Sequence, residues 1–462
     1  MLDLLNDLIW SKLLIVMLIG LGLFFTIASR FVQFRYFGSM FHIFAEAFKR
    51  QPGQLSSFQA LMLSVAGRVG AGNIAGVSVA IMLGGPGAIF WMWMIALLGM
   101  ATGFAESVLG QLYKVRDENG EFRGGPAYYI KQGLNKTWLA VAFSLCLFFG
   151  YGFVFSAVQA NTITDALNNA YAFPSEYVGI AIIALAALIV VGGLRGIARF
   201  AEFVVPFMGI SYVLVALAIT FINISELPAM LMDIITSAFG LQEAGAGALG
   251  AAIKNGIQRG LYSNEAGSGS VPHAAASAVP NPNHPVSQGY IQMLGVFLDT
   301  LILCTSTAFI ILLAGGSSSE QMEGIRLTQD AMSSHLGEGG TDFVAAAISL
   351  FAFTSVVANY AYGESNLHMF KLDNKIGRAV YTIGYLGMIY WGAQAALPQV
   401  WAMADMALGL MTVINIIAIV WMTPTIVSIS KDYFKKKDSG EKVEYNVGDC
   451  DIQGKSEDGV WD

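Results

Sequence analysis

Apolar stretches about as long as a membrane-crossing helix recur along this chain from residue 11 to residue 430. A helix needs about 20 apolar residues to cross the roughly 30 Å hydrocarbon layer of a bilayer. The chain has 462 residues, of which 55% are hydrophobic and only 12% are charged, and water-soluble domains rarely have such a composition. The sequence therefore predicts an all-α polytopic membrane protein without a large soluble domain.

Glycine, proline and charged residues divide this apolar sequence into eleven predicted transmembrane helices. The first helix stands alone, and the acidic residues before it argue against a cleaved signal peptide. The other ten form two sets of five, because glycine interrupts the first member of each set. The predicted helices cover residues 11–29, 58–83, 86–112, 138–168, 176–194, 202–222, 244–278, 286–315, 342–368, 376–396 and 402–430.

The loop charges predict the orientation of the helices. Alternate loops are rich in Lys and Arg, and the loops between them are acidic or neutral. Cytoplasmic loops carry the excess of Lys and Arg, so we expect the N-terminus outside and the C-terminus in the cytoplasm. Because five is an odd number, the two sets would enter the membrane from opposite faces, which makes an inverted repeat.

These patterns divide the chain into five regions. Residues 58–222 and 244–431 are the two predicted repeats, and residues 223–243 are the extracellular connection between them. Residues 1–57 hold the first helix and a phenylalanine-rich segment, which fits an amphipathic helix on the cytoplasmic surface or a packed linker. Residues 432–462 form an acidic cytoplasmic tail, which we expect to be disordered.

Two glycine-rich interruptions, at residues 67–73 and 263–269, occupy matching places in the two repeats. Each glycine inside a helix costs about 1 kcal/mol relative to alanine. Close packing of small residues would explain one such cluster. Two matching clusters favour a binding site, because backbone carbonyls freed at membrane depth need a cation, water or substrate.

The two predicted breaks expose backbone groups of both polarities, amide N–H groups and carbonyl oxygens. The N-terminus of the second half-helix presents amide groups suited to the carboxylate of a small solute. Freed carbonyls would attract the ammonium of that solute, so a zwitterionic amino acid fits both ends. The sequence gives no nucleophile motif or metal-ligand spacing, and we predict that the protein is not an enzyme and has no nucleic-acid partner.

Several polar side chains lie near the breaks in sequence or within long apolar spans. Asn73 is a candidate ligand or a helix cap, and Gln159 is a candidate ligand or an interhelical hydrogen bond. Residues 354 and 355 place two hydroxyls within a long apolar run, and such hydroxyls usually donate to the backbone carbonyl one helical turn earlier. An ionisable group near mid-membrane should be paired. We therefore hypothesise that a nearby cation neutralises the carboxylate of Glu265. Its proposed neutralising partners are Arg68, Lys254 or Arg259.

The run Gly-Gly-Pro-Gly-Ala-Ile-Phe-Trp-Met-Trp at residues 84–93 closely resembles a motif of the alanine or glycine:cation symporter family, the sodium:alanine symporters. Residues 70–76 and 263–270 are also similar to motifs of that family, and the resemblance covers roughly residues 10–435. It implies a LeuT-type core of two five-helix inverted repeats in a bacterial or archaeal plasma membrane. It also implies sodium-driven uptake of alanine or glycine by a monomer, with Na⁺ as coupling ion and no covalent cofactor.

The same resemblance implies two groups of site residues. Sodium would be held by the carbonyls of Ala66, Val69 and Phe351 and the hydroxyls of Thr354 and Ser355. Substrate would contact Gly70, Ala71, Gly72, Asn73, Gln159, Asn264, Gly267 and Gly269. Many relatives carry Thr where Ala71 stands, so that hydroxyl is absent here. Proton coupling through Glu265 and a passive channel are the alternatives, and the choice between alanine and glycine stays open.

Overall fold

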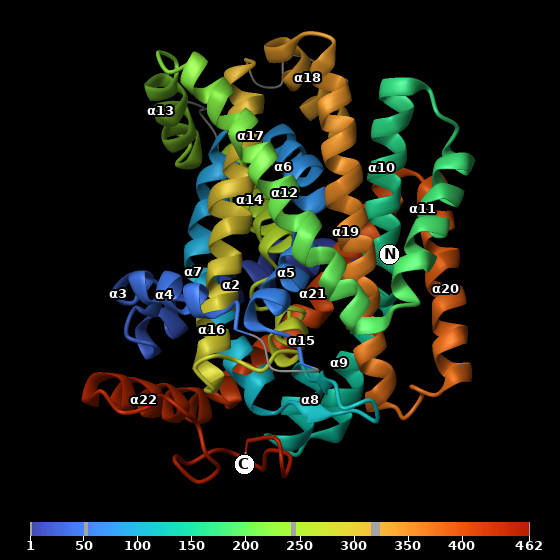
Figure 1. The fold of residues 1–462 in the computed structure, drawn as a ribbon. Helices are drawn as coiled ribbons and strands as arrows, with labels where there is room; N and C mark the ends of the chain where they lie inside the picture. The colour runs from blue at the N-terminus through green and yellow to red at the C-terminus, as the bar shows by residue number, and fades with distance from the viewer. Residues whose placement is uncertain (1, 50–53, 242–245, 316–323, 462) are drawn as a thin grey trace.

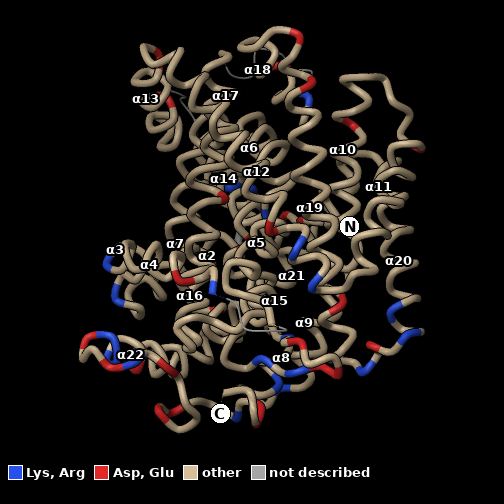
Figure 2. The backbone as a smooth tube through the Cα atoms, in the orientation of Figure 1, with Lys and Arg blue, Asp and Glu red and all other residues tan. Residues whose placement is uncertain are grey.

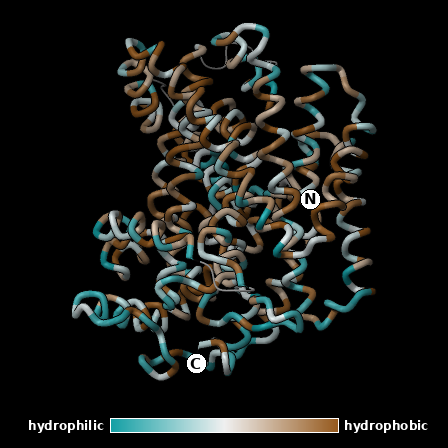
Figure 3. Tube along the Cα trace, viewed as in Figure 1, coloured by the Kyte–Doolittle hydropathy of each residue, from teal (hydrophilic) through white to brown (hydrophobic). Residues whose placement is uncertain are grey.

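A bundle of long helices dominates the computed structural model, which describes residues 2–49, 54–241, 246–315 and 324–461 (Figure 1). Within these residues, seven helices are long and apolar enough to cross a membrane, and a bent pair makes an eighth if counted as one span. Figure 3 shows that apolar residues dominate these helices. In Figure 2, charged residues gather mainly at the end of the bundle that carries α8 and α22. The chain is a multi-pass helical membrane protein.

The first half of the chain, through residue 222, contains a short hairpin besides its helices. In chain order its elements are α1 (Leu2–Leu8), η1 (Ile9–Leu13), α2 (Leu14–Ala28), α3 (Val32–Arg35), α4 (Phe37–Glu46), α5 (Ser57–Arg68), η2 (Gly72–Gly76), α6 (Val77–Gly84), α7 (Gly87–Leu112), β1 (Val115–Arg116), β2 (Phe122–Arg123), α8 (Pro126–Gln132), α9 (Thr137–Phe149), η3 (Gly150–Val154), α10 (Phe155–Tyr171), α11 (Ser175–Val190) and α12 (Gly193–Ile222). The two strands pair antiparallel, with Val115 opposite Arg123.

The elements of the second half are all helices within the part that the structure describes, and a non-helical tail follows them. Its elements are α13 (Leu227–Ala238), α14 (Ala246–Asn264), α15 (Val271–Ala276), α16 (Pro285–Val296), η4 (Phe297–Cys304), α17 (Thr305–Leu313), α18 (Ile325–Leu336), α19 (Gly339–Met369), α20 (Lys375–Gln394), α21 (Leu397–Trp421) and α22 (Thr423–Ser439). The π-helical segments η1, η3 and η4 continue into α2, α10 and α17 respectively.

The spans predicted for residues 176–194, 244–278 and 376–396 correspond to helices that are not among the seven long apolar ones. Eleven spans therefore remain a prediction. The span predicted for residues 402–430 is wrong at its end, because α21 stops at Trp421 and a separate helix, α22, follows. Pro424 lies in the first turn of α22, where its missing N–H is tolerated.

Small residues let the central helices approach closely. α7 packs along both α14 and α16, while α5 packs against α12 and α19. A side chain at Gly256 of α14 would place its Cβ 2.4 Å from the carbonyl oxygen of Ala88 in α7. This small-residue contact is the usual way for membrane helices to pack closely. It brings α14 beside α7, and the two glycine-rich segments lie in the interior of the bundle.

The segment that follows α2 forms a short amphipathic helix with one packed face. Met40 and Ile43 of α4 are buried, whereas Phe37 and Phe41 are 37% and 44% exposed. The helix rests on α16. The structure thus combines the two interpretations of this segment, since α4 is amphipathic and is also packed.

The C-terminal tail was predicted to be disordered, and this prediction is wrong for the described residues 440–461. Trp461 is buried and donates its indole N–H to the carbonyl of Leu112 over 3.0 Å. The ammonium of Lys114 lies 4.6 Å from the centre of the Trp461 ring. Tyr445 is also buried, and its N–H donates to Asn283. A few aromatic anchors hold the tail, although its average composition is acidic.

Candidate functional site

The first glycine-rich segment is a true break in a helix. α5 ends at Arg68, η2 begins at Gly72, and the two parts are bent by 53°. Side chains take up two of the amide groups that the break releases. The N–H of Gly70 donates to Oδ1 of Asn73 over 3.0 Å, and the N–H of Ala71 donates to Oε1 of Gln159 over 2.8 Å. Four predicted substrate residues therefore lie together.

Carbonyl oxygens from the first break converge on a hydroxyl of α19. The Oγ of Ser355 lies 2.9 Å from the carbonyl oxygen of Ala66, 3.2 Å from that of Val69 and 3.3 Å from that of Phe351. The Oγ1 of Thr354 donates to the Phe351 carbonyl over 2.8 Å. The structure brings all five residues proposed for sodium into one cluster.

This cluster contains more acceptors than donors. A hydroxyl has one proton, so Ser355 can donate fully to only one of its three carbonyl neighbours. All of the residues involved are buried. Unwound backbone carbonyls at such depth are the groups with which membrane transporters coordinate Na⁺. The arrangement is suited to a small cation that several oxygens would coordinate at once.

Gly70 is required by the close approach of three elements. A Cβ at this position would lie 2.4 Å from Oγ of Ser355 and 2.5 Å from Oε1 of Gln159. A Cβ at Gly72 would lie 3.2 Å from Cα of Ser263, which belongs to the second glycine-rich segment. The two segments are therefore in contact at Gly72.

The second glycine-rich segment is also a break. α14 ends at Asn264, α15 begins at Val271, and the residues between them include Gly267 and Gly269 with φ of +94° and +88°. Positive φ at both positions favours glycine, because L side chains rarely adopt this backbone conformation.

An internal carboxylate occupies the amide groups of the second break. The N–H groups of Gly267 and Gly269 donate to Oε1 and Oε2 of Glu106, over 2.9 and 3.2 Å. The side-chain amide of Asn415 donates to Oε2 over 2.8 Å and to the carbonyl of Gly267 over 3.0 Å. Tyr129 in turn bonds to Asn415. The N–H groups of Gly267 and Gly269 are therefore not free for the substrate contact that the family resemblance implies, because Glu106 of α7 already satisfies them.

Sequence reasoning missed Glu106, although a signal was present. It is the only charged residue among the 26 residues of α7. A lone carboxylate in an apolar span is costly unless it has partners. Here it accepts from two amides of the second break and from Asn415 of α21, and its side chain is fully buried.

A second internal carboxylate joins the two breaks. Oδ1 of Asp299, in η4, accepts from the side-chain amide of Asn73 over 2.7 Å. Oδ2 accepts from the hydroxyls of Ser263 and Thr300, each over 2.8 Å. Asn73 belongs to the first break and Ser263 lies at the end of α14. No local sequence pattern indicates these contacts of Asp299, because they span 226 and 36 positions of the chain.

Glu265 forms no ion pair within the described ranges, and the hydroxyl of Ser270 donates to its Oε2 over 2.6 Å. Arg68 donates to Ser64 and to Gln292. Neutralisation by Arg68 stays a prediction, because these hydrogen bonds of Arg68 are to neutral groups. The other two candidate cations form the ion pairs Lys254–Asp7, at 3.0 Å, and Arg259–Asp405, at 2.7 Å. Lys254 lies eleven positions before Glu265, about 16 Å along a helix, so it cannot reach.

Asn264 provides an unused donor beside the breaks. Its Oδ1 accepts the N–H of Ala266 over 3.0 Å. Its Nδ2 is buried and has no hydrogen-bond partner among the described residues. Buried amide donors nearly always find a partner, so a bound solute is a natural acceptor for this group.

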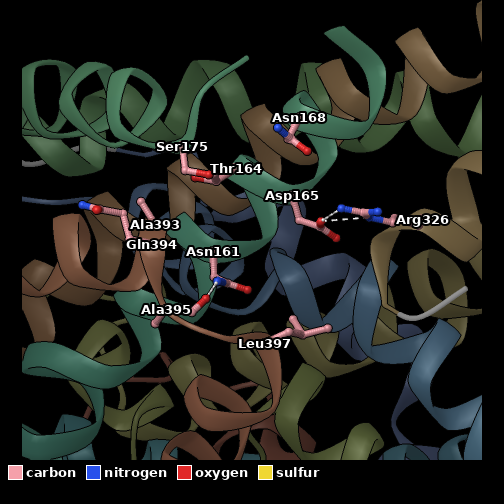
Figure 4. A pocket seen from close by; sticks show the side chains of 10 residues that line it. All are labelled: Asn161, Thr164, Asp165, Asn168, Ser175, Arg326, Ala393, Gln394, Ala395 and Leu397. Carbon is pink, nitrogen blue, oxygen red and sulfur yellow. Dashed lines mark hydrogen bonds and ion pairs between the residues drawn. The ribbon is translucent and has the colours of Figure 1, made fainter. Parts of the chain in front are cut away.

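A separate cavity of about 420 Å³ lies near the end of α10 (Figure 4). Arg326 donates to Asp165 across it over 2.6 Å, and Asn161 donates to the carbonyl of Ala395 over 2.7 Å. Asn161 and Asp165 project from one face of α10, whereas Gln159 lies on the opposite face at 3.6 residues per turn. The cavity is thus distinct from the site at the breaks.

Comparison with known proteins identifies relatives along almost the whole chain. The model of the sodium:alanine symporter family matches residues 1–447. The chain is 46% identical over 437 residues to the probable sodium/glutamine symporter of Bacillus subtilis (strain 168), covering 94% of this chain and 91% of that protein. It is 40% identical over 453 residues to the putative sodium/proton-dependent alanine carrier of the same organism, with coverages of 94% and 92%. It is 36% identical over 441 residues to the sodium/alanine symporter of Methanococcus maripaludis, with coverages of 93% and 95%.

Proposed function

Because the chain belongs to the sodium:alanine symporter family, we propose that it couples inward movement of Na⁺ to uptake of alanine or glycine by alternating access. Membership of a transporter family implies that the protein is not an enzyme. Na⁺ is the expected coupling ion.

The cluster around Ser355 is the observation that carries this proposal. Three carbonyl oxygens within 3.3 Å of one hydroxyl give Na⁺ a set of oxygen ligands after small shifts. The ligands come from the end of α5, from Val69 in the break and from α19, so the ion would hold the first break against α19. Coupling then requires that Na⁺ favour the substrate-binding state by about 1–3 kcal/mol.

We place the amino acid between the two breaks. Its carboxylate would accept from the free side-chain amide of Asn264. It would also accept from the N–H groups of the first break, which would leave Asn73 and Gln159 and turn to the substrate. Its ammonium would be drawn toward the acceptor oxygens around Asp299. The amides of Gly267 and Gly269 would stay with Glu106 and shape the site indirectly.

We also propose that the bundle is a LeuT-type core of two inverted repeats, with the N-terminus outside and the C-terminus in the cytoplasm. The breaks at matching places in the sequence support the repeat. The alternation of loop charge supports the orientation.

Counterflow in proteoliposomes tests the function. The purified protein is assayed with alanine, glycine and glutamine, with and without Na⁺. The proposal predicts sodium-dependent accumulation of alanine or glycine. A double variant, Thr354→Ala with Ser355→Ala, should lose the sodium dependence. Unaltered sodium dependence in that variant would show that the cation binds elsewhere, and flux without accumulation would favour a passive channel.

Proton coupling is the second candidate, because Glu265 and Asp299 are buried carboxylates bonded to hydroxyl and amide groups. Uptake driven by a pH gradient in sodium-free vesicles would select this candidate. Glu265→Gln and Asp299→Asn would then show which carboxylate carries the proton.

A further inference from the structure

The segment that holds α3 and α4 lies beside α22 at one edge of the bundle, outside the proposed transport site. In Figure 1, α3 and α4 project from the left of the bundle, and α22 lies below them. α4 has 10 residues, about 15 Å of helix, which is too short to cross a membrane. The rings of Tyr36 and Phe434 stack between this segment and α22 with their centres 4.5 Å apart. These helices therefore form one surface.

Two cations share this surface without an acidic partner. The guanidinium of Arg35 lies 5.2 Å from the centre of the Tyr36 ring, and the ammonium of Lys437 lies 5.5 Å from the same centre. Lys437 also donates to Oγ of Ser39 over 2.7 Å. Both cations are exposed, and neither forms an ion pair within the described ranges. Two like charges around one ring create a local excess of positive potential.

Apolar side chains border these cations. Phe34 is 58% exposed and Phe41 is 44% exposed, whereas Met40 and Ile43 of the same segment are buried. Aromatic side chains next to Arg and Lys are typical of helices that lie in the interface plane of a bilayer. The phenyl rings would enter the acyl boundary, and the cations would remain at the level of the phosphates.

We propose that Arg35 and Lys437, held by Tyr36 and Ser39, form a binding site for the phosphate of an anionic phospholipid. The ring of Tyr36 fixes the positions of both cations, and the lipid phosphate supplies the missing negative charge. Phe34 and Phe41 pack against the acyl chains of the same lipid. This site does not depend on the transport function.

Retention of phosphatidylglycerol tests the site directly. The full chain is reconstituted in nanodiscs of phosphatidylcholine and phosphatidylglycerol in equal parts, transferred to detergent, and analysed by native mass spectrometry. The wild type should retain phosphatidylglycerol in preference to phosphatidylcholine. Arg35→Gln with Lys437→Gln should lower this preference about 25-fold, or fivefold for each cation, from roughly 1 kcal/mol per basic residue near an anionic surface.

A matched control separates this site from a general effect of charge. Lys131→Gln with Lys375→Gln removes two exposed cations from α8 and α20, and it should leave the preference unchanged. An equal loss in both double variants, or no preference in the wild type, would overturn the proposal. If the first double variant fails to fold, Arg35→Lys with Lys437→Arg takes its place, because it conserves both charges. This variant should prefer phosphatidylglycerol at low salt and lose the preference at high salt, and no preference at low salt would overturn the proposal.

Discussion

The two helix breaks differ in what satisfies their backbone groups. At the first break, carbonyls of Ala66 and Val69 crowd around one hydroxyl from α19, so the acceptors outnumber the donors. At the second break, the amides of Gly267 and Gly269 are satisfied by Glu106 of α7. The first break thus leaves carbonyl oxygens that one hydroxyl proton cannot all satisfy, whereas the amides of Gly267 and Gly269 are satisfied within the protein. Two interruptions that look alike in sequence have different electrostatic roles.

The largest expected effect comes from removing the carboxylate of the second break. Glu106→Ala leaves the N–H groups of Gly267 and Gly269 unpaired and takes one of two acceptors from the amide of Asn415, and each unpaired buried group costs about 1–3 kcal/mol. We expect the free energy of unfolding to fall by about 3 kcal/mol or more and uptake to be lost. Thermal unfolding in detergent and alanine uptake measure both effects. Glu106→Gln keeps one acceptor oxygen and should be milder. Equal stability of Glu106→Ala and the wild type would contradict the claim that Glu106 satisfies the amides of the second break.

Next in size is the effect of adding a methyl group at the first break. Gly70→Ala would place Cβ 2.4 Å from Oγ of Ser355, and such overpacking typically costs about 1–3 kcal/mol. We expect uptake to be abolished while the protein still folds. Gly38→Ala is the control, because a Cβ there meets no atom within 4 Å. Normal uptake by Gly70→Ala would mean that the cluster around Ser355 is looser than described.

Asp299→Asn tests the link between the breaks. The substitution keeps the shape of the side chain and removes its charge, while Asn73 and Ser263 must find new partners. The loss of stability should be about 1 kcal/mol, and the apparent affinities for Na⁺ and alanine should both fall. Uptake at varied concentrations of each solute measures them. A change in only one affinity would show that Asp299 serves a single break.

The smallest effect is expected from Asn264→Ala. Its Nδ2 has no partner among the described residues, and its Oδ1 accepts one N–H, that of Ala266, so the free energy of unfolding should fall by no more than about 1 kcal/mol. A lost hydrogen bond to substrate costs about 1 kcal/mol, which predicts a KM for alanine raised about fivefold at constant kcat. An unchanged KM would remove Asn264 from the substrate site.

Local sequence patterns predicted one part of this site well and another part poorly. Clustered glycines indicated both breaks, because glycine disfavours a continuous helix and permits positive φ. The partners of the breaks were less accessible, since Glu106 lies 161 positions from Gly267 and Arg259 lies 146 positions from Asp405. Such pairs depend on how α7, α14 and α21 pack. The tail was misjudged because Tyr445 and Trp461 determine its packing and its average composition does not.

Sodium-dependent thermal stabilisation tests most directly whether the first break is the one open to a cation. A ligand that binds only the folded state raises the unfolding temperature with its concentration. We predict that Na⁺ raises this temperature for the wild type and for Glu106→Gln, and that Ser355→Ala loses the response. The same response in Ser355→Ala as in the wild type would contradict the assignment of the cation to the first break.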